Sequence, residues 1–148
     1  VFVTIEQNKE LRGCIGTYLP TRINIAEEII NNAIAAATED YRFEAIKKEE
    51  LPYLSYIVYI LSAPELVEGI NELNPKEFGI IVKTAPFTYP NESPVFDGNV
   101  SFKAGLLLPD LKGINTPEEQ FSIACQKGGI NPAKEKVFIY RFRAEKHQ

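Results

Sequence analysis

The chain has 148 residues, a length that suits one domain with its own hydrophobic core. Hydrophobic residues make up 45% and charged residues 24%, which are ordinary values for a globular domain. The net charge of -4 argues against non-specific binding to DNA or anionic lipid, and no apolar run approaches the roughly 18 residues of a membrane span. We therefore expect a cytoplasmic protein that needs neither DNA nor a membrane as partner.

The two cysteines indicate a reducing compartment. Cys14 lies in a tight glycine context and Cys125 in an expected helix, so we favour free thiols over a disulfide. The chain opens in the middle of an expected strand at Val1–Ile5, which resembles an excised piece of a longer chain. The absence of a visible targeting segment therefore carries little meaning.

The first elements in chain order are a hairpin and a helix. Val1–Ile5 and Leu11–Thr17 alternate as strands do, and the polar residues between them predict a turn. Asn24 is a suitable cap for a helix that begins at Ile25 and ends near Tyr41. The apolar positions of this helix fall on roughly one face: Ile25, Ile29, Ala33, Ala36 and Ala37.

The middle of the chain alternates strands with irregular segments. The charged residues Lys47–Glu50 predict a short helical turn or loop. Tyr53–Ser62 and Phe78–Val82 are rich in β-branched and aromatic residues, which is typical of strands. Thr84–Asn99 carries three prolines and few aliphatic residues, so we interpret it as an irregular insertion.

The last third predicts a strand, a helix and a strand. Val100–Leu108 is strand-like, and Thr116–Glu119 is a capping box with proline at the first helical position. The helix runs to about Lys127, where Gly128 and Gly129 end it, and Val137–Phe142 is the final strand. Mixed strands and helices with an antiparallel first pair predict the α+β class. Each half holds about three strands and a helix, although no sequence repeat is visible.

Three motifs, in this order, resemble the AMMECR family, also described as protein A of the AmmeMemoRadiSam system. The first is Leu11–Thr17 (LRGCIGT), and the second is Asp40–Phe43 (DYRF), which leads to Glu50-Leu51-Pro52. The third is Gly105–Asp110 (GLLLPD), followed by Glu119-Gln120-Phe121 and Ala124-Cys125. The resemblance covers essentially the whole chain and implies a single AMMECR-type domain over residues 1–148 that lacks the N-terminal part of its full chain. It implies a fold of two β3-α2 structural repeats that share one barrel-like, largely antiparallel sheet, with a deep cleft near the cysteine motif.

The resemblance also implies partners but no established activity and no known cofactor. Relatives stand alone, or are fused to or encoded beside a Memo-like domain, which resembles class III extradiol dioxygenases, and a radical-SAM protein. The sequence departs from the family pattern at Thr84–Asn99, which is longer than the usual turn, and at Tyr41, where a small residue or proline is more usual. Both departures affect one rim of the implied cleft and put the transfer of a ligand from relatives in doubt.

Cys14 is the first candidate for chemistry. Arg12 stands two residues away and shares its face in a straight strand, and a nearby cation favours the reactive thiolate. The alternative is a small packed residue where Gly13 and Gly16 let two backbones approach closely. The one histidine, His147, is next to the end of the chain, so a Cys–His dyad is not expected.

Two arginines and two aspartates complete the candidate site. Arginine forks bind carboxylate or phosphate, so Arg12 and Arg42 suit an anionic small molecule or an RNA backbone if both face one cleft. The alternative is that Arg42 pairs with Asp40 or Glu39 to hold the helix end. Asp40 is a candidate general acid or base, or a turn-stabilising carboxylate. Asp110, in a loop, is expected to line the cleft.

The remaining motifs favour structure over chemistry. Cys125 is expected to be inert core, and Tyr53, Tyr56 and Tyr59 to be packing residues instead of a base-stacking platform. No CxxC, paired histidine or HExxH motif is present, so we expect no zinc site.

These observations favour a domain that binds a small anionic or nucleotide-like ligand beside the motif at residues 11–16. It would act with Memo-like and radical-SAM partners if it is an enzyme. Cys14 and Asp40 are then the catalytic candidates, and the ligand-binding candidates are Arg12, Gly13, Gly16, Arg42 and Asp110. The alternatives are a non-catalytic RNA- or protein-binding module and a redox-sensing thiol at Cys14.

Overall fold

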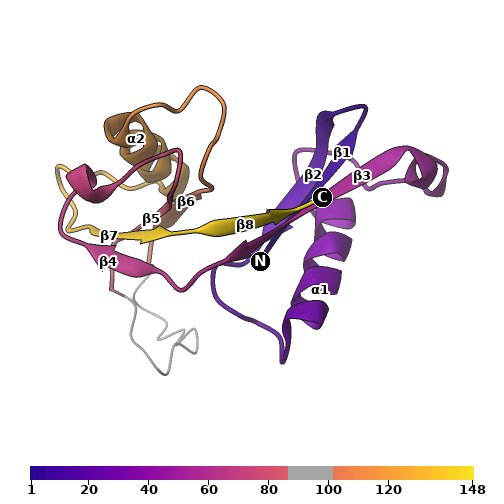
Figure 1. The fold of residues 1–148 in the computed structure, drawn as a ribbon, viewed down its shortest axis with the longest axis horizontal. Coiled ribbons are helices and arrows are strands. Elements are labelled where there is room, and N and C mark those ends of the chain that lie inside the picture. Colours follow the sequence, from indigo (N-terminus) through magenta and orange to yellow (C-terminus); the bar gives the residue numbers. More distant parts are fainter. Residues whose placement is uncertain (87–101) are drawn as a thin grey trace. The chain divides into compact units, whose positions relative to one another are not determined.

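The computed structural model describes residues 1–86 and 102–148, which form two compact units (Figure 1). Unit 1 comprises Val1–Leu61 and Glu145–Gln148, and unit 2 comprises Ser62–Ala144. The predicted insertion at Thr84–Asn99 lies, except for its first three residues, outside the described residues.

Unit 1 is built on the predicted hairpin. Strands β1 (Phe2–Gln7) and β2 (Glu10–Gly16) pair antiparallel. Asn8 and Lys9 connect them with φ values of 56° and 66°, the left-handed geometry that a two-residue hairpin turn requires. Strand β3 (Leu54–Leu61) pairs with β1, and β8 (Ala144–His147) follows, so the sheet order is β2-β1-β3-β8.

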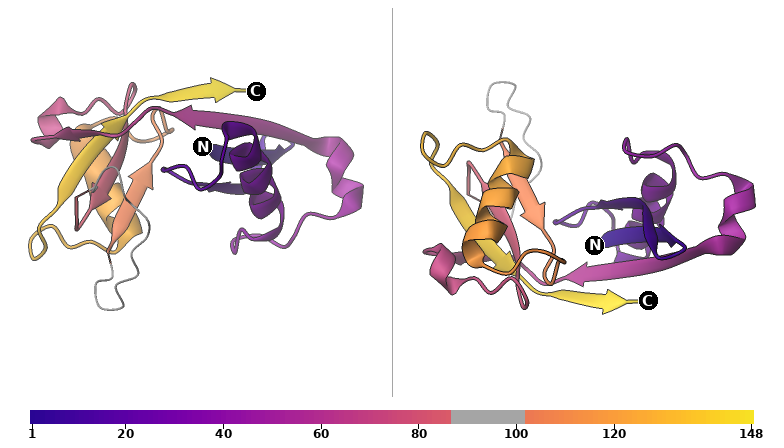
Figure 2. Two further views of the ribbon diagram at one scale, coloured as in Figure 1. Left: turned by 90° about the horizontal axis from the view of Figure 1, so that it is seen from below. Right: turned by 90° about the horizontal axis from the view of Figure 1, so that it is seen from above.

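Helix α1 (Ile25–Thr38) covers one face of this sheet (Figures 1 and 2). The Asn24 side chain caps it by accepting a hydrogen bond from the Glu27 N–H, as predicted. The helix ends at Thr38, before the predicted end near Tyr41.

The buried face of α1 differs from the predicted apolar face. Its buried residues are Glu28, Asn32 and Ala36, whereas Ile25 is 48% exposed. Hydrogen bonds explain the difference: Asn32 donates to the Val1 carbonyl, and Glu28 accepts from four donors described below. A polar side chain can be buried when its hydrogen-bond partners are buried with it. The spacing of apolar residues in the sequence does not reveal such a side chain.

A 3-10 helix, η1 (Lys48–Tyr53), follows α1 at the predicted charged turn. The Lys47 backbone N–H donates to the Glu50 carboxylate at 2.8 Å, which fixes the start of the turn. This contact makes Glu50 part of a rigid element close to β2.

Unit 2 has the sheet order β4-β7-β5-β6. Its strands are β4 (Glu65–Val67), β5 (Gly79–Lys83), β6 (Ala104–Leu107) and β7 (Phe138–Phe142), with a short 3-10 helix, η2 (Ile70–Glu72), after β4. Helix α2 (Pro117–Gly128) packs on this sheet (Figure 2), and it has the predicted capping box and a left-handed Gly129 at its end. The core of unit 2 consists of Val67, Leu73, Ile80, Val82, Leu107, Ile114, Ala124, Cys125 and Ile130.

The predicted α+β class is confirmed. Every strand pair between β1, β2 and β3, and between β4, β5, β6 and β7, is antiparallel. Among the described residues, however, the strands divide between two four-stranded sheets instead of sharing the one barrel-like sheet that the resemblance implies. The short strands β4 and β8 were not predicted from the sequence. Each is the outer strand of its sheet: β4 lies next to β7, and β8 lies next to β3.

The two units repeat one arrangement: two strands, a helix and a third strand that pairs with the first. In unit 1, Gly13 on β2 lies so close to α1 that a Cβ there would be 2.2 Å from the Ala36 carbonyl oxygen. In unit 2, a Cβ on Gly105 of β6 would be 1.8 Å from the Ala124 carbonyl oxygen of α2. Both glycines are therefore required by the close approach of a helix to its sheet.

A hydrogen bond repeats with the same spacing. Asn32, four residues before Ala36, donates to the Val1 carbonyl before β1 at 3.0 Å. Gln120, four residues before Ala124, donates to the Phe78 carbonyl before β5 at 2.8 Å. The weak similarity between the two halves is thus a structural repeat with residue-by-residue counterparts.

Candidate functional site

The candidate site is built on the outer edge of β2, which among the described strands pairs with β1 alone. Cys14 lies opposite Thr4 of β1, and Gly13 lies opposite Ile5. Gly13 and Gly16 both serve close packing, since a Cβ on Gly16 would be 2.2 Å from the Phe2 ring. Cys14 itself is partly exposed and unpaired with Cys125, which is the predicted free-thiol state.

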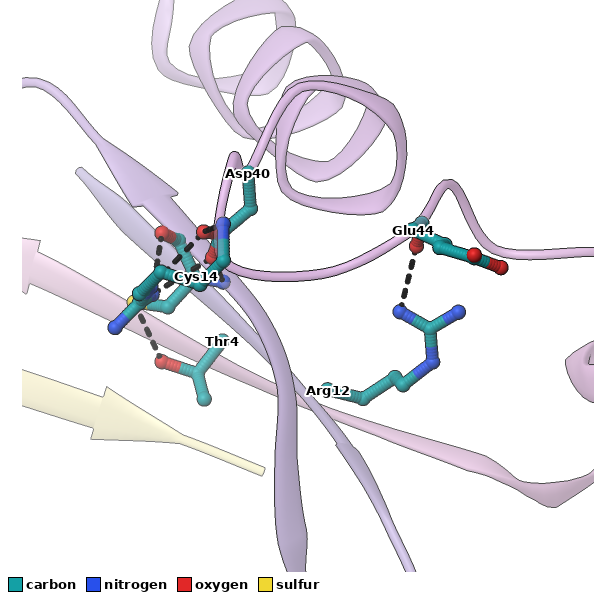
Figure 3. A network of polar contacts seen from close by, with 6 residues as sticks. Thr4, Arg12, Cys14, Asp40 and Glu44 are labelled. Atoms are coloured by element: carbon teal, nitrogen blue, oxygen red, sulfur yellow. Dashed lines mark hydrogen bonds and ion pairs between the residues drawn. The ribbon is translucent and has the colours of Figure 1, made fainter.

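Asp40 and Arg42 hold the backbone of Cys14 from this open edge. The Cys14 N–H donates to Asp40 Oδ2 at 2.8 Å (Figure 3), and Arg42 Nη2 donates to the Cys14 carbonyl at 3.4 Å. The carboxylate and the guanidinium therefore satisfy the two backbone groups that a further strand would otherwise pair. This arrangement fixes the position of the thiol-bearing residue.

Asp40 and Arg42 also bind each other in a fork. Arg42 Nε donates to Asp40 Oδ1 at 2.9 Å, Arg42 Nη2 donates to Oδ2 at 2.7 Å, and the Arg42 N–H donates to Oδ1 at 3.2 Å. Asp40 is 6% exposed, whereas the Arg42 side chain is 44% exposed. The side-chain hydrogen bonds from Arg42 outweigh the effect of burial and hold the pKa of Asp40 well below its usual range.

An ionised Asp40 cannot act as a general acid at neutral pH, and its lone pairs are occupied by four donors. The contacts favour the alternative considered for the sequence, in which Arg42 pairs with Asp40 to hold the helix end. In this role Asp40 positions Cys14 and Arg42.

Thr4 lies next to the Cys14 thiol. Thr4 Oγ1 donates to Cys14 Sγ at 3.2 Å, as Figure 3 shows. The sulfur thus has a neutral hydrogen-bond donor beside it. Burial, followed by the electrostatic effect of Cys14, raises the pKa of Tyr59 on β3.

Arg12 takes part in a different cluster. Its Nε and Nη2 donate to the two Glu50 carboxylate oxygens at 2.8 and 3.1 Å, and its Nη1 donates to the Glu44 carbonyl at 2.9 Å. These hydrogen bonds with Glu50 raise the pKa of Arg12. The β1–β2 pairing shifts by one residue between Ile5 and Glu6, so β2 is not straight at Arg12. The expectation that Arg12 and Cys14 share one face was based on a straight strand, and Figure 3 shows the guanidinium directed away from the thiol.

The structure therefore brings Cys14, Asp40 and Arg42 together and separates Arg12 from them. Asp110 belongs to unit 2, where it adopts a left-handed φ of 54° and forms an exposed ion pair with Lys76. Cys125 is 3% exposed in the core of unit 2, and burial raises the pKa of its thiol, in agreement with the predicted inert role.

Sequence reasoning missed Thr4 and underrated Glu50. Thr4 carries no motif, and only the register of the hairpin places it opposite Cys14. Glu50 stands in the second motif of the resemblance, so its role as the partner of Arg12 could have been proposed from that motif. Tyr53 and Tyr56, in η1 and β3, are 69% and 45% exposed.

Among residues 1–86 and 102–148, no group of three or more histidine, cysteine, aspartate or glutamate side chains could hold a metal ion. In the same residues, neither helix has the length and apolar character needed to cross a bilayer.

The sequence matches the AMMECR1 family over residues 1–147. The chain belongs to the AMMECR1 family. A protein of Thermotoga maritima is 45% identical over 148 residues, which cover 99% of this chain and 76% of that protein. The crystal structure of the uncharacterized protein PH0010 of Pyrococcus horikoshii superimposes with a TM-score of 0.77 at 30% identity, covering 98% of this chain and 70% of that one.

Relatives of very different length share this domain. Protein CA_C1420 of Clostridium acetobutylicum is 40% identical over the whole chain, yet the match spans only 28% of that protein. The names of these three AMMECR1 relatives state no activity, so the similarity establishes family and fold and leaves the chemistry to the residues of the site.

Proposed function

We propose that this AMMECR1 domain binds a small anionic ligand beside Cys14, with the outer edge of the Arg42 guanidinium as the anion contact and the thiol as a neighbouring reactive group. One observation carries the proposal. The Asp40–Arg42 pair holds both backbone groups of Cys14 while 44% of the Arg42 side chain stays exposed next to a partly exposed thiol.

The exposed edge distinguishes Arg42 from Arg12. The Arg12 side chain is 17% exposed and uses Nε, Nη1 and Nη2 in internal hydrogen bonds. None of the hydrogen bonds among the described residues uses Arg42 Nη1, so this nitrogen has donors to offer a ligand. The ring of Phe43, 5.5 Å from the guanidinium carbon, supports the orientation of Arg42 from one face.

Unit 2 serves as an internal comparison for the site. The counterpart of Cys14 is Leu106 on β6, whose carbonyl accepts a hydrogen bond from Lys127 Nζ at 3.0 Å. In both units, therefore, a cationic side chain donates to the carbonyl at this position of the edge strand. A contact that both units share indicates a structural role. The thiol and the buried carboxylate belong to the site in unit 1, which supports a use for Cys14 beyond packing.

The test compares two alkylating reagents that differ in charge. Iodoacetamide is neutral and iodoacetate is an anion; with either, the sulfur attacks the methylene carbon and iodide leaves. Peptide mapping by mass spectrometry follows Cys14 separately from buried Cys125. We expect Arg42→Gln to slow the alkylation of Cys14 by iodoacetate about 3- to 10-fold, which is the effect of one charge a few ångströms away near a surface. The rate of alkylation by iodoacetamide should change less than about 2-fold.

Arg42→Lys and Arg22→Gln are the matched controls. Lysine keeps the charge at position 42, so it should restore most of the iodoacetate rate. Arg22 is exposed and takes part in none of the hydrogen bonds of Cys14, so removal of its charge should leave both rates unchanged. Equal slowing of both reagents by Arg42→Gln would show that Arg42 only shapes the strand, and the anion site would be abandoned.

The identity of the ligand, a catalytic role for Cys14 and partnership with Memo-like and radical-SAM proteins remain part of the proposal. The alternative, a non-catalytic RNA- or protein-binding module, has its best support in the exposed Tyr53 and Tyr56. An RNA backbone would use the same Arg42 edge, so protection of Cys14 from iodoacetamide by a short single-stranded RNA, but not by inorganic phosphate, would favour that alternative.

A further inference from the structure

Unit 1 contains a cavity that takes no part in the Cys14 site. Its volume is about 290 Å³, at the lower end of the range for small-molecule sites and enough for about ten water molecules. The segment between β2 and α1 forms one wall, and the end of β3 forms another. The lining residues are Val1, Tyr18, Leu19, Pro20, Arg22, Ile23, Asn24, Ile25, Glu28, Ile60 and Leu61.

A buried carboxylate keeps this wall in place. Glu28 is 3% exposed and accepts hydrogen bonds from the Thr17 and Thr21 hydroxyls and from the Thr21 and Arg22 backbone N–H groups. Three of these bonds are 2.8 to 2.9 Å long. The segment at 17–22 is thereby tied to α1, so the cavity is formed before any ligand arrives.

The chemistry of the lining defines the ligand. Most of the lining is aliphatic, with Leu19, Ile25 and Ile60 among the contributors, and it suits an apolar body. Arg22 lines the cavity and is exposed, and none of the ion pairs among the described residues includes it. Glu28 does not compete for Arg22, because four donors already occupy both of its oxygens.

We infer that this cavity binds a small molecule with an apolar body and one anionic group, the body against the aliphatic lining and the anion on the Arg22 guanidinium. An aromatic or branched aliphatic carboxylate has this chemistry and this size. The inference does not depend on Cys14, Asp40 or Arg42, so it stands or fails separately from the proposed function.

The experiment uses two matched probes, 2-naphthoate and 2-naphthamide, which have the same shape but differ in charge. Each is titrated into the 148-residue chain, and backbone amide shifts in two-dimensional ¹H–¹⁵N NMR spectra report both the position and the dissociation constant. We expect shifts concentrated at residues 18–25 and 60–61, and naphthoate binding at least 5-fold tighter than naphthamide. Arg22→Gln should remove that preference without changing the affinity for naphthamide.

Two variants of α1 test the location. Ile25 lines the cavity at the start of the helix and is 48% exposed, while Ile34 is 56% exposed on the same helix and outside the lining. Ile25→Glu should weaken both probes at least 10-fold, and Ile34→Glu should weaken neither.

Three results would overturn the inference. No shift at residues 18–25 with millimolar naphthoate means that the cavity is not a binding site. Equal affinity for the two probes, unaffected by Arg22→Gln, means that the cavity does not select for an anionic group. Loss of binding in Ile34→Glu but not in Ile25→Glu places the probes on the outer face of α1 instead.

Discussion

Glu28 provides the sharpest test of how unit 1 is held together. Its carboxylate accepts four hydrogen bonds at a site that is 3% exposed. In Glu28→Gln the amide oxygen can keep the Thr21 and Arg22 backbone N–H donors while the amide NH2 faces the Thr17 and Thr21 hydroxyls, which can turn to accept. The substitution therefore removes the charge that strengthens these hydrogen bonds, and we expect a loss of about 1–3 kcal/mol at pH 7.

The pH dependence follows from the pKa of the same group. Burial alone would raise the pKa of Glu28, but the hydrogen bonds from Thr17, Thr21 and Arg22 lower it to about 2, from 4.5 in an unfolded chain. A carboxylate with a lowered pKa contributes stability that is fully present above the unfolded value and is lost as the pH falls toward the folded value. The contribution is at most about 3 kcal/mol, and it disappears between about pH 5 and pH 2.

Urea unfolding followed by far-ultraviolet circular dichroism, at intervals from pH 7 to pH 2, measures both effects. The difference between the native chain and Glu28→Gln should be constant above about pH 5 and shrink as the pH falls. Because Asp40 titrates in both proteins, its contribution cancels. Glu27→Gln, on the same turn but exposed, should cost less than about 1 kcal/mol at pH 7. A difference in unfolding free energy that stays constant down to pH 2 would refute the role of the ionised Glu28 carboxylate.

Two further substitutions test the candidate site. Gly13→Ala puts a Cβ 2.2 Å from the Ala36 carbonyl oxygen, so we expect a loss of about 1–3 kcal/mol in urea unfolding, whereas Gly69→Ala meets only the flexible end of a side chain and should cost less than 1 kcal/mol. Asp40→Ala leaves the Cys14 N–H without its acceptor, so hydrogen exchange at that amide should accelerate at least 10-fold; unchanged exchange would mean that another group protects it.

Much of the fold was predictable because its signals are local. The hairpin turn, the Asn24 cap, the capping box at Thr116 and the glycine end at Gly129 each depend on a few adjacent residues with specific backbone requirements. The structure confirms all of them. The short strands β4 and β8 escaped prediction because a three- or four-residue outer strand leaves little alternation to detect.

The site was less predictable because it depends on register and burial. The motif at residues 11–16 makes Cys14 a candidate, but the irregular pairing near Glu6 directs Arg12 to Glu50 instead of the thiol. The buried positions of Glu28 and Asn32 contradict apolar periodicity, because their partners include backbone groups that no sequence pattern marks.

The structural repeat separates the parts of the site that the fold needs from those that it does not. Gly13 and Gly105 both allow a helix to approach its sheet, and both edge strands have a carbonyl held by a cation. Features shared by both units are sufficiently explained by packing. The pairing of a thiol with a buried carboxylate at Cys14 and Asp40 is not shared by unit 2. The counterpart of Cys14 is Leu106. The counterpart of Asp40, four residues after Ala124 as Asp40 is after Ala36, is Gly128, which packs tightly against the backbone of β6. A residue that departs from its counterpart, at a cost in buried charge, is a better functional candidate than a residue that repeats it.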